Sequence, residues 1–178
     1  MNLDVVVIGR NSHKHLADCL ESVLSAHWSH GEKKVFYIDG HSSDNSMEIA
    51  ESHGVITQGL KVKKASAAAG RNQGGKAGDA EFIQFVDSDV ILHQDWLEVA
   101  GRAMFDNPEL VAVRGSLKER YPRRNLFHFA ASLEWDEKVG PCEGIGGSVM
   151  VRRSAWEYAG GYPVISSGED PELGRRLL

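Results

Sequence analysis

The sequence is short of cysteine, of long apolar runs and of positive charge, and each shortage argues against a class of protein. Its two cysteines, Cys19 and Cys142, form no metal-ligand pattern, so we expect unpaired thiols in a reducing compartment. No stretch supplies the about 20 apolar residues of a membrane-spanning helix, and the N-terminus does not have the pattern of a signal peptide. The net charge of −5 over 178 residues gives no reason to expect nucleic acid as a partner. We therefore expect a cytoplasmic protein.

The sequence does contain a regular alternation of short apolar runs with segments whose apolar residues recur three or four positions apart. The first pattern is typical of buried strands and the second of amphipathic helices. Strands are predicted at residues 3–8, 34–39, 54–57, 82–86, 110–114 and 149–151. Helices are predicted at residues 16–24, 45–52, 66–77, 96–104 and 154–158. This order favours a single α/β domain over residues 1–178, with a mostly parallel central sheet and helices on both faces.

Two regions fit this alternation less well. Between residues 116 and 140, a basic cluster around Tyr121 precedes an aromatic-rich segment. This region is either an excursion over the active-site face or a solvated basic loop beside a core helix. Near the end of the chain, Asp170 is expected to cap a final helix whose first residue is Pro171. Because that helix reaches residue 178 without a stop signal, we expect the domain to be truncated at its C-terminus.

Acidic residues recur where the predicted strands and helices begin or end. Asp39 ends the second strand, Asp87 and Asp89 follow the fourth, and Glu169 and Asp170 lie at the start of the final helix. Each acid alone could be a turn former or a helix cap. The carboxyl ends of parallel strands meet at one edge of the sheet, where open α/β folds bind ligands, so Asp39 and Asp87 should share a cleft. Paired carboxylates repel each other, which favours a hard divalent cation such as Mg²⁺ held together with substrate phosphates.

A set of short motifs in a fixed order resembles the family 2 glycosyltransferases with the GT-A fold. The set covers nearly the whole chain and includes Val86-Asp87-Ser88-Asp89 and Gly168-Glu169-Asp170. The other matching segments are residues 5–23, 37–46, 69–74, 144–147 and 174–177. Any one of these motifs is weak evidence, but the ordered set at these spacings is strong. The resemblance implies a Rossmann-like fold that binds a nucleotide-diphospho-sugar, and an enzyme that transfers the sugar with inversion at its anomeric carbon.

The resemblance also implies roles for individual residues. Asp89 would be the main ligand of Mg²⁺ or Mn²⁺ on the donor diphosphate, and Asp87 would assist it or contact the ribose or sugar. Asp39 would hydrogen-bond the nucleobase, and Arg71 would lie near the nucleotide. Asp170 would be the catalytic base that activates the acceptor hydroxyl, with Glu169 as its closest competitor. Three further residues are assigned to the nucleotide-sugar, namely Gly9, Asn11 and Ser88.

The resemblance does not fix the substrates. The donor could be a UDP-, GDP- or dTDP-sugar, and the acceptor a saccharide, a lipid-linked compound or another hydroxyl compound, with cell-envelope polysaccharide synthesis as the expected setting. The loop at residues 9–11 lacks the proline of many members, and His41 replaces a smaller or amide residue. The Gln-x-x-Arg-Trp motif of processive synthases is missing, which truncation would explain, so processivity stays undecided. A peripheral position at the inner face of the membrane would come from the missing C-terminal part.

Three alternative interpretations remain. A glycoside hydrolase also uses two carboxylates, but acids at strand ends suit a nucleotide better. A nucleotidyltransferase would often carry a glycine-rich phosphate loop after its first strand, and residues 9–12 match such a loop poorly. A domain that binds a nucleotide-sugar without catalysis would keep the same motifs. Release of pyrophosphate would indicate the nucleotidyltransferase, whereas release of a nucleoside diphosphate would indicate the transferase.

Overall fold

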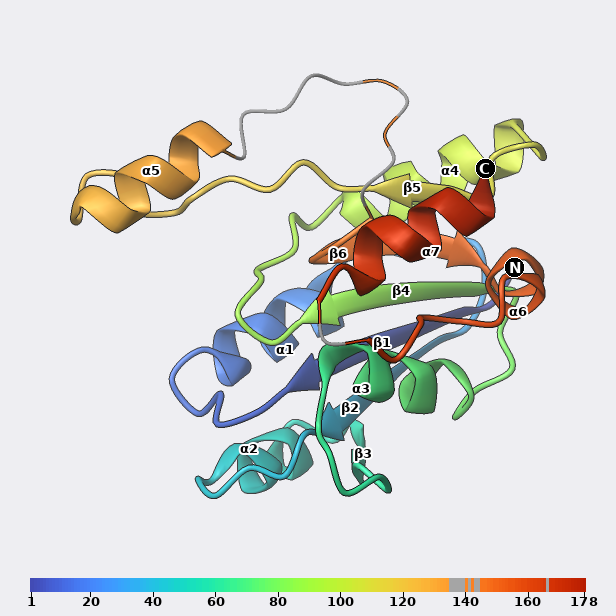
Figure 1. Cartoon of the computed structure of the whole chain (residues 1–178). Coiled ribbons are helices and arrows are strands. Elements are labelled where there is room, and N and C mark those ends of the chain that lie inside the picture. Colours follow the sequence, from blue (N-terminus) through green and yellow to red (C-terminus); the bar gives the residue numbers. More distant parts are fainter. Residues whose placement is uncertain (135–139, 141, 143–144, 166) are drawn as a thin grey trace.

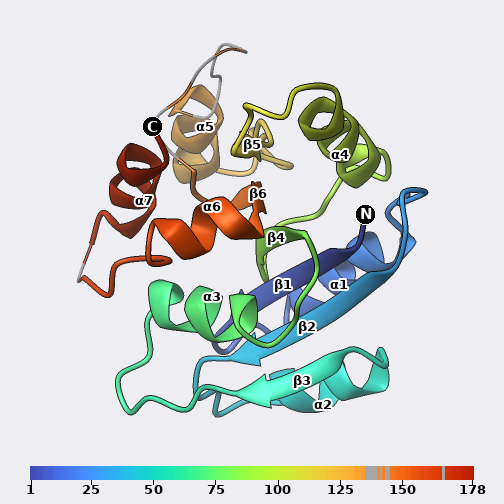
Figure 2. The ribbon, with the colours of Figure 1, turned by 90° about the vertical axis from the view of Figure 1, so that its right-hand side faces the viewer.

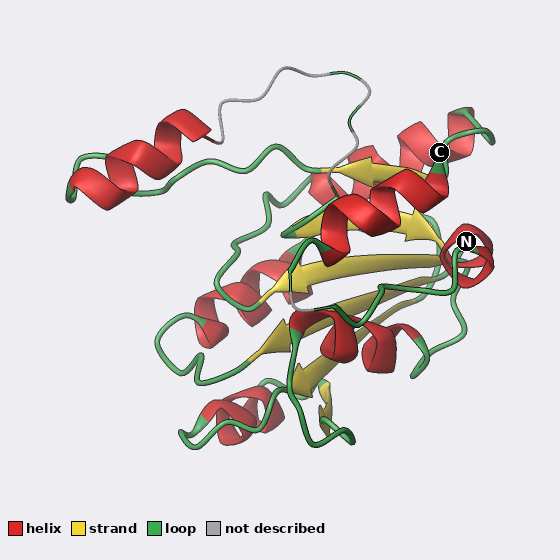
Figure 3. Ribbon diagram, viewed as in Figure 1, coloured by secondary structure: helices red, strands yellow, loops and turns green. Residues whose placement is uncertain are grey.

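The central feature of the molecule is a β-sheet that lies between two layers of helices (Figure 1, Figure 3). The computed structural model describes residues 1–134, 140, 142, 145–165 and 167–178. Within these residues no helix is both long and apolar enough to cross a membrane. The predicted α/β class, with a mostly parallel sheet and helices on both faces, is confirmed.

The sheet has six strands in the order β3-β2-β1-β4-β6-β5. Their bounds are β1 Leu3–Gly9, β2 Lys33–Asp39, β3 Ile56–Gly59, β4 Phe82–Asp87, β5 Ala112–Arg114 and β6 Ser148–Arg152. Strands β1 to β4 are parallel, whereas β6 runs antiparallel to both of its neighbours, β4 and β5. The carboxyl ends of β1, β2 and β4 therefore lie side by side at one edge of the sheet, and that edge is where a ligand site is expected.

The helices form two layers around this sheet (Figure 2). One face is covered by α1 (Leu16–Ser25), α2 (Ser46–Ser52) and α4 (Trp96–Asp106). The opposite face is covered by α3 (Ala67–Gly75), α6 (Arg153–Tyr158) and α7 (Glu169–Leu177). Helix α5 (Leu126–Glu134) belongs to neither layer and projects from the body of the molecule (Figure 1). Two apolar cores result, one on each face.

Strand β1 shows how the two cores produce the sequence pattern. Val5 and Val7 pack into the core on the α1 side, while Val6 and Ile8 pack into the core on the α3 side. Successive side chains of a strand point to opposite faces, so a strand that is covered on both faces is mostly apolar. This is why residues 5–8 form a continuous apolar run without alternation, while the buried Asp4 near the start of the strand pairs with Arg153.

Three elements differ from their predictions. Strand β3 was predicted at residues 54–57 and lies at Ile56–Gly59, and β5 is shorter than the predicted 110–114. Both are edge strands with partly exposed residues, so their apolar pattern is weak. For the segment that contains α5, the sequence left two interpretations: an excursion over the active-site face, or a solvated basic loop beside a core helix. The core-helix interpretation is wrong, because Phe127 is 89% exposed and Leu126 is 80% exposed.

Both cysteines are free thiols, as predicted. Cys142 is exposed, whereas Cys19 is buried on α1 directly behind the acidic strand end. Its Sγ lies 3.7 Å from the main-chain oxygen of Asp87. Burial, helped by the charges of Asp89 and Asp87, raises the pKa of the Cys19 thiol to about 12. The thiol is therefore protonated at neutral pH and serves as a small apolar group in the core.

Candidate functional site

A pocket of about 510 Å³ opens at the edge where β1, β2 and β4 end. Its walls come from the loop after β1, the turn after β2, the start of α3 and the residues after β4. The lining includes Gly9, Arg10, Asn11, Ser12, His15, Gly40, Ser66, Gly70, Asp87, Ser88 and Asp89. Five predicted ligand-binding residues, Gly9, Asn11, Asp87, Ser88 and Asp89, are thus brought together in one cavity. The volume falls within the range of about 300–1,000 Å³ that is usual for small-molecule sites.

The two β4-end carboxylates have different surroundings. Asp89 is exposed at the pocket wall, while the side chain of Asp87 is 33% exposed and contacts Arg71 through Oδ1. Between them, the Ser88 hydroxyl hydrogen-bonds the Ser12 hydroxyl at 2.6 Å and so ties this turn to the loop after β1. This arrangement leaves the Asp89 side chain exposed to solvent at the pocket wall, and its role as a metal ligand stays a prediction.

Gly9 is required for this close approach of the two loops. A Cβ atom at Gly9 would lie only 2.5 Å from Oγ of Ser88 and 2.7 Å from Oγ of Ser12. No real side chain is tolerated at such distances, so any substitution would push the two hydroxyls apart. Because Gly9 has no side chain, the two loops can approach each other at this point, and the Gly9 backbone can come close to a ligand.

Arg71 holds the centre of the site. Its Nη2 donates to Oδ1 of Asp87 at 2.8 Å, and its Nη1 donates to Oδ1 of Asp170 at 2.9 Å. The same Nη1 lies 3.6 Å from Oε1 of Glu169. The side chain is only 4% exposed, and its Cζ lies 5.1 Å from the centre of the Tyr162 ring. The guanidinium is thus directed at carboxylates and is not part of the pocket lining.

The electrostatics of this cluster are dominated by burial and by a surplus of negative charge. Burial raises the pKa of Asp87, and the charges of Asp89 and Glu169 add to this effect, although Arg71 acts in the opposite direction. Burial likewise raises the pKa of Asp170, opposed by Arg71 and supported by Glu169 and Asp87. One guanidinium therefore faces more carboxylate charge than it can neutralise. A further cation at this edge would lower the free energy of the ionised acids.

The start of α7 differs from its prediction. The residue that caps this helix is Gly168, with φ of 86°, and the helix begins at Glu169. The prediction that Asp170 is the N-cap and Pro171 the first helical residue is wrong. Because its carboxylate is bonded to Arg71, Asp170 does not cap the main chain of α7. This correction frees Asp170 from the structural duty that the sequence assigned to it.

Asp39 lies beside the pocket and is almost fully buried, at 4% exposure. Its Oδ2 accepts a hydrogen bond from the main-chain N–H of Ser42 at 2.8 Å, and its Oδ1 accepts one from the Tyr37 hydroxyl at 3.2 Å. The next residue, Gly40, belongs to the pocket wall. Each carboxylate oxygen can accept a second hydrogen bond, so contact with a nucleobase stays compatible with this arrangement. The predicted role of Asp39 in reading the base remains a prediction.

The loop at residues 9–11 and the turn after β2 support each other. Asn11 adopts a positive φ of 55°, and its Oδ1 accepts from the main-chain N–H of Ser43 at 2.8 Å. His41 also adopts a positive φ, of 65°, and its Nε2 lies 2.8 Å from the main-chain oxygen of Val62. Asn11 therefore ties the first loop of the pocket wall to the turn after β2, and His41 ties that turn to the segment after β3.

Sequence analysis missed several residues that build this site. Tyr162 stacks on Arg71 and is held by Asn72, whose side chain makes hydrogen bonds of 2.7 and 2.8 Å with the main chain of Tyr162. Gly146 approaches Asp170 so closely that a Cβ there would lie 2.6 Å from its Oδ2. Arg10 adds an exposed cationic side chain to the pocket wall, and His15 adds an exposed imidazole. The sequence feature that could have indicated these close contacts is the set of glycines within residues 144–147 and at 160–161, for which no role was predicted.

The chemistry of the two carboxylates at and after the end of β4, Asp87 and Asp89, suits a divalent cation. Among the described residues there is no group of three or more histidine, cysteine or acidic side chains arranged to hold a metal ion. Mg²⁺ does not need one, because it is usually bound by one or two carboxylates together with substrate phosphates and waters. Asp89, exposed at the pocket wall, and Asp87, in the electronegative cluster, fit that mode.

Solved structures with the same architecture are glycosyltransferases. S. aureus TarS residues 1–349 superposes with a TM-score of 0.74 at 17% sequence identity, over 99% of this chain and 55% of that one. The mannosyltransferase PcManGT from Pyrobaculum calidifontis, solved with GDP-Man and Mn²⁺, gives a TM-score of 0.77 at 17% identity, over 98% and 51% of the two chains. At these identities the likeness shows the fold alone, which is the GT-A fold of nucleotide-sugar transferases.

Sequence comparison then identifies the family. The family described as Glycosyl transferase family 2 matches residues 4–157, so the chain belongs to that family. Glycosyltransferase AglE of Haloferax volcanii is 25% identical over 124 residues, which are 67% of this chain and 40% of AglE. Glycosyltransferase GlyG of Streptococcus pneumoniae serotype 4 is 31% identical over 100 residues, 54% of this chain and 33% of GlyG. The chain thus spans less than half the length of these relatives.

Proposed function

We propose that this chain carries the catalytic site of an inverting glycosyltransferase, which moves a sugar from a nucleotide-diphospho-sugar to an acceptor hydroxyl. The observation that carries the proposal is the bridge made by Arg71. It joins Asp87, on the wall of the donor-sized pocket, to Asp170, which lies outside that wall. In this proposal Asp87 would serve the donor side and Asp170 the acceptor side, and the bridge would hold them beside each other for a direct displacement at the anomeric carbon.

The donor would occupy the pocket with its diphosphate near Asp89. The backbone of Gly9 and the side chains of Asn11 and Ser88 would contact it, and Asp39 would lie next to the base. The exposed Arg10 would add a positive charge for the diphosphate. Mg²⁺ or Mn²⁺ bound by Asp89 and Asp87 would neutralise charge on the leaving nucleoside diphosphate. The structure of PcManGT with GDP-Man and Mn²⁺ supports a divalent metal by likeness of fold.

Asp170 would accept the proton of the acceptor hydroxyl. A base must be ionised to act, and Arg71 stabilises the ionised carboxylate through the 2.9 Å contact. Burial meanwhile raises the pKa of Asp170, which increases the proton affinity of the carboxylate. Glu169 stays the competitor, because it lies on the same helix start at 3.6 Å from the same Arg71 nitrogen. The shorter, hydrogen-bonded contact favours Asp170.

The donors of structural neighbours include UDP-GlcNAc for TarS and GDP-Man for PcManGT. A UDP-, GDP- or dTDP-sugar is therefore the donor class to test. The curated relative TarP of Staphylococcus aureus is a poly(ribitol-phosphate) β-N-acetylglucosaminyltransferase, 30% identical over 100 residues. A polyol or saccharide hydroxyl is thus a suitable acceptor class for this chain.

Calorimetry of nucleoside diphosphate binding tests the donor side of the proposal. We expect UDP or GDP to bind at least about tenfold more tightly with Mn²⁺ than with EDTA, because the cation links Asp89 to the diphosphate. Asp89→Asn should abolish this gain. Asp79→Asn is the matched control, because its side chain is 92% exposed and pairs only weakly with Lys34, at 3.8 Å. Equal affinity with Mn²⁺ and with EDTA would overturn the metal assignment.

A further inference from the structure

Helix α5 has its apolar side turned to solvent. At 3.6 residues per turn, Leu126, Phe129 and Leu133 fall on one stripe, with Phe127 at its border. All four side chains are exposed, from 52% for Phe129 to 89% for Phe127. His128 points the other way, and its Nδ1 lies 2.8 Å from Oε1 of Glu119. A surface helix normally shows the opposite arrangement, so this apolar face is built to be covered.

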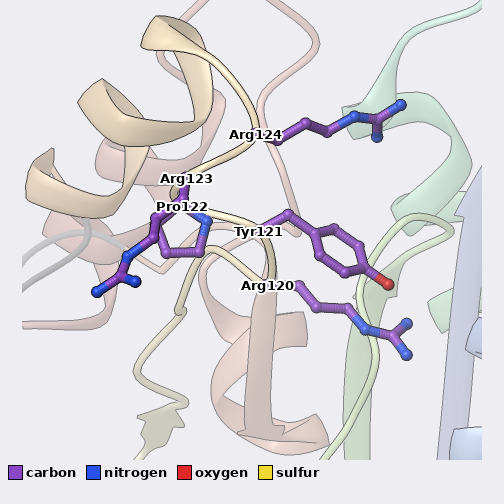
Figure 4. Close-up of a pocket in the computed structure, with 5 residues that line it drawn as sticks. All are labelled: Arg120, Tyr121, Pro122, Arg123 and Arg124. Atoms are coloured by element: carbon purple, nitrogen blue, oxygen red, sulfur yellow. The ribbon is translucent and has the colours of Figure 1, made fainter.

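A basic loop leads directly into this helix. Its cations are Lys118, Arg120, Arg123 and Arg124, all exposed. Residues 120–124 line a cavity of about 350 Å³. The side chains of Arg120, Tyr121 and Arg124 extend to one side of the loop, and that of Arg123 extends to the other (Figure 4). Residues 117–133 carry these four cations and a single carboxylate, a net charge of +3. The chain as a whole carries −5, so the remaining residues carry −8. The positive charge is therefore concentrated beside the apolar face.

The loop is attached at the same edge of the sheet as the pocket. Nη1 of Arg120 lies 3.5 Å from Oδ2 of Asp18, which is in the first turn of α1. That turn directly follows His15, which lines the pocket. Helix α5 lies on the side of the molecule toward which β1 and β4 run (Figure 1). Whatever covers α5 would therefore lie on the same side of the molecule as the candidate site.

We propose that α5 and the basic loop dock on the surface of an anionic lipid bilayer. The exposed phenylalanines and leucines would enter the boundary between headgroups and acyl chains, and the arginines would contact lipid phosphates. Such paired apolar and basic signals are what stable but reversible membrane attachment requires. A second copy of this chain fits the face less well, because it would bring two segments of net charge +3 together. Docking in this way would turn the side of the molecule that carries the pocket toward the membrane.

Co-sedimentation of the full chain with vesicles tests the inference, and it does not depend on sugar transfer. We expect binding to vesicles of phosphatidylglycerol and phosphatidylcholine, little binding to phosphatidylcholine alone, and loss of binding in high salt. Arg123→Glu with Arg124→Glu should weaken binding by at least about twenty-fivefold, because each of the two lost cations strengthens binding to an anionic surface roughly fivefold. Phe127→Ser with Leu133→Ser should also reduce it strongly, and unchanged melting temperatures would show that these exposed variants fold.

Matched control variants test whether vesicle binding is specific to this surface or is non-specific adsorption. Lys63→Glu with Lys64→Glu makes the same change in net charge at another exposed pair of cations, and it should retain most of the binding. Phe105→Ser removes a phenylalanine that is 64% exposed on α4 and should have little effect. Equal binding to both kinds of vesicle, or undiminished binding by the α5 variants, would overturn the proposal. A doubling of molecular mass that Phe127→Ser abolishes would assign the face to a second copy and overturn it as well.

Discussion

Gly146 offers a way to move the proposed base without changing its chemistry. A Cβ at this position would lie 2.6 Å from Oδ2 and 3.2 Å from Cγ of Asp170. Gly146 is not among the residues with positive φ, so alanine is compatible with its backbone. To reach an ordinary contact of 3.4 Å the carboxylate oxygen would have to move by about 0.8 Å. Because Oδ1 is bonded to Arg71 at 2.9 Å, that movement displaces or lengthens the pairing.

A displacement of this size has a predictable effect on rate. Misplacing a catalytic group by about 1 Å can cost roughly a hundredfold in rate, so Gly146→Ala should lower kcat by roughly that factor. The affinity for the donor should stay nearly constant, because Gly146 is not in the pocket lining. The free energy of unfolding should change by no more than about 1–2 kcal/mol, since the loss of chain entropy in the unfolded state offsets part of the overpacking.

Transfer kinetics and calorimetry on the full-length polypeptide measure both quantities. Gly115→Ala is the control, because a Cβ there would meet the Trp96 ring at an ordinary 3.6 Å. Asp170→Asn combined with Gly146→Ala should be no slower than Asp170→Asn alone, because both changes act on the same carboxylate. If Gly146→Ala keeps near-normal kcat, or if it weakens donor binding as much as it slows transfer, the reasoning is refuted.

Two further predictions concern Asp39, beside the pocket, and Arg71, at the centre of the acidic cluster. Asp39→Asn should weaken the preferred nucleoside diphosphate more than inorganic pyrophosphate in calorimetry, and an equal loss for both ligands would indicate a purely structural role in the turn at Ser42. Arg71→Lys should shift the acid limb of the kcat/KM profile to higher pH, because Arg71 lowers a pKa of Asp170 that burial raises above 3.8, and the ionised base is the active form. Activity of this variant would then be lost at low pH and recovered as the pH rises. A limb that stays in place or moves to lower pH would contradict the positioning role of Arg71.

Much of the fold could be predicted from the sequence because its signals are local. Strands β1, β2 and β4 are covered on both faces, so each contains a short, mostly apolar run that can be recognised locally. The placement of Asp39 and Asp87 at the same edge of the sheet, on either side of β1, then followed from parallel topology. The antiparallel direction of β6 could not be predicted from the sequence, because the apolar pattern of a strand does not depend on its direction in the sheet.

The parts of the site that could not be predicted depend on contacts between distant residues. Arg71 and Asp170 are 99 positions apart, and no local pattern shows that they form a 2.9 Å hydrogen bond. That contact also explains why the N-cap of α7 was predicted wrongly. Asp-Pro is by itself a good helix start, and only the distant partner Arg71 binds the Asp170 carboxylate instead. The outward apolar face of α5 is a similar case. Its periodicity marks an amphipathic helix but does not tell which side faces the protein.

The most direct measurement of the central claim is single-turnover sugar transfer by Asp170→Asn in the full-length polypeptide, with Glu169→Gln beside it. The asparagine keeps an oxygen that can accept from Arg71 and removes the proton acceptor. The account predicts release of a nucleoside diphosphate and inversion of the sugar in the unsubstituted protein. It also predicts at least a roughly hundredfold slower transfer in Asp170→Asn with unchanged donor affinity, and near-normal transfer in Glu169→Gln. Release of pyrophosphate, or near-normal transfer by Asp170→Asn together with its loss in Glu169→Gln, would contradict it.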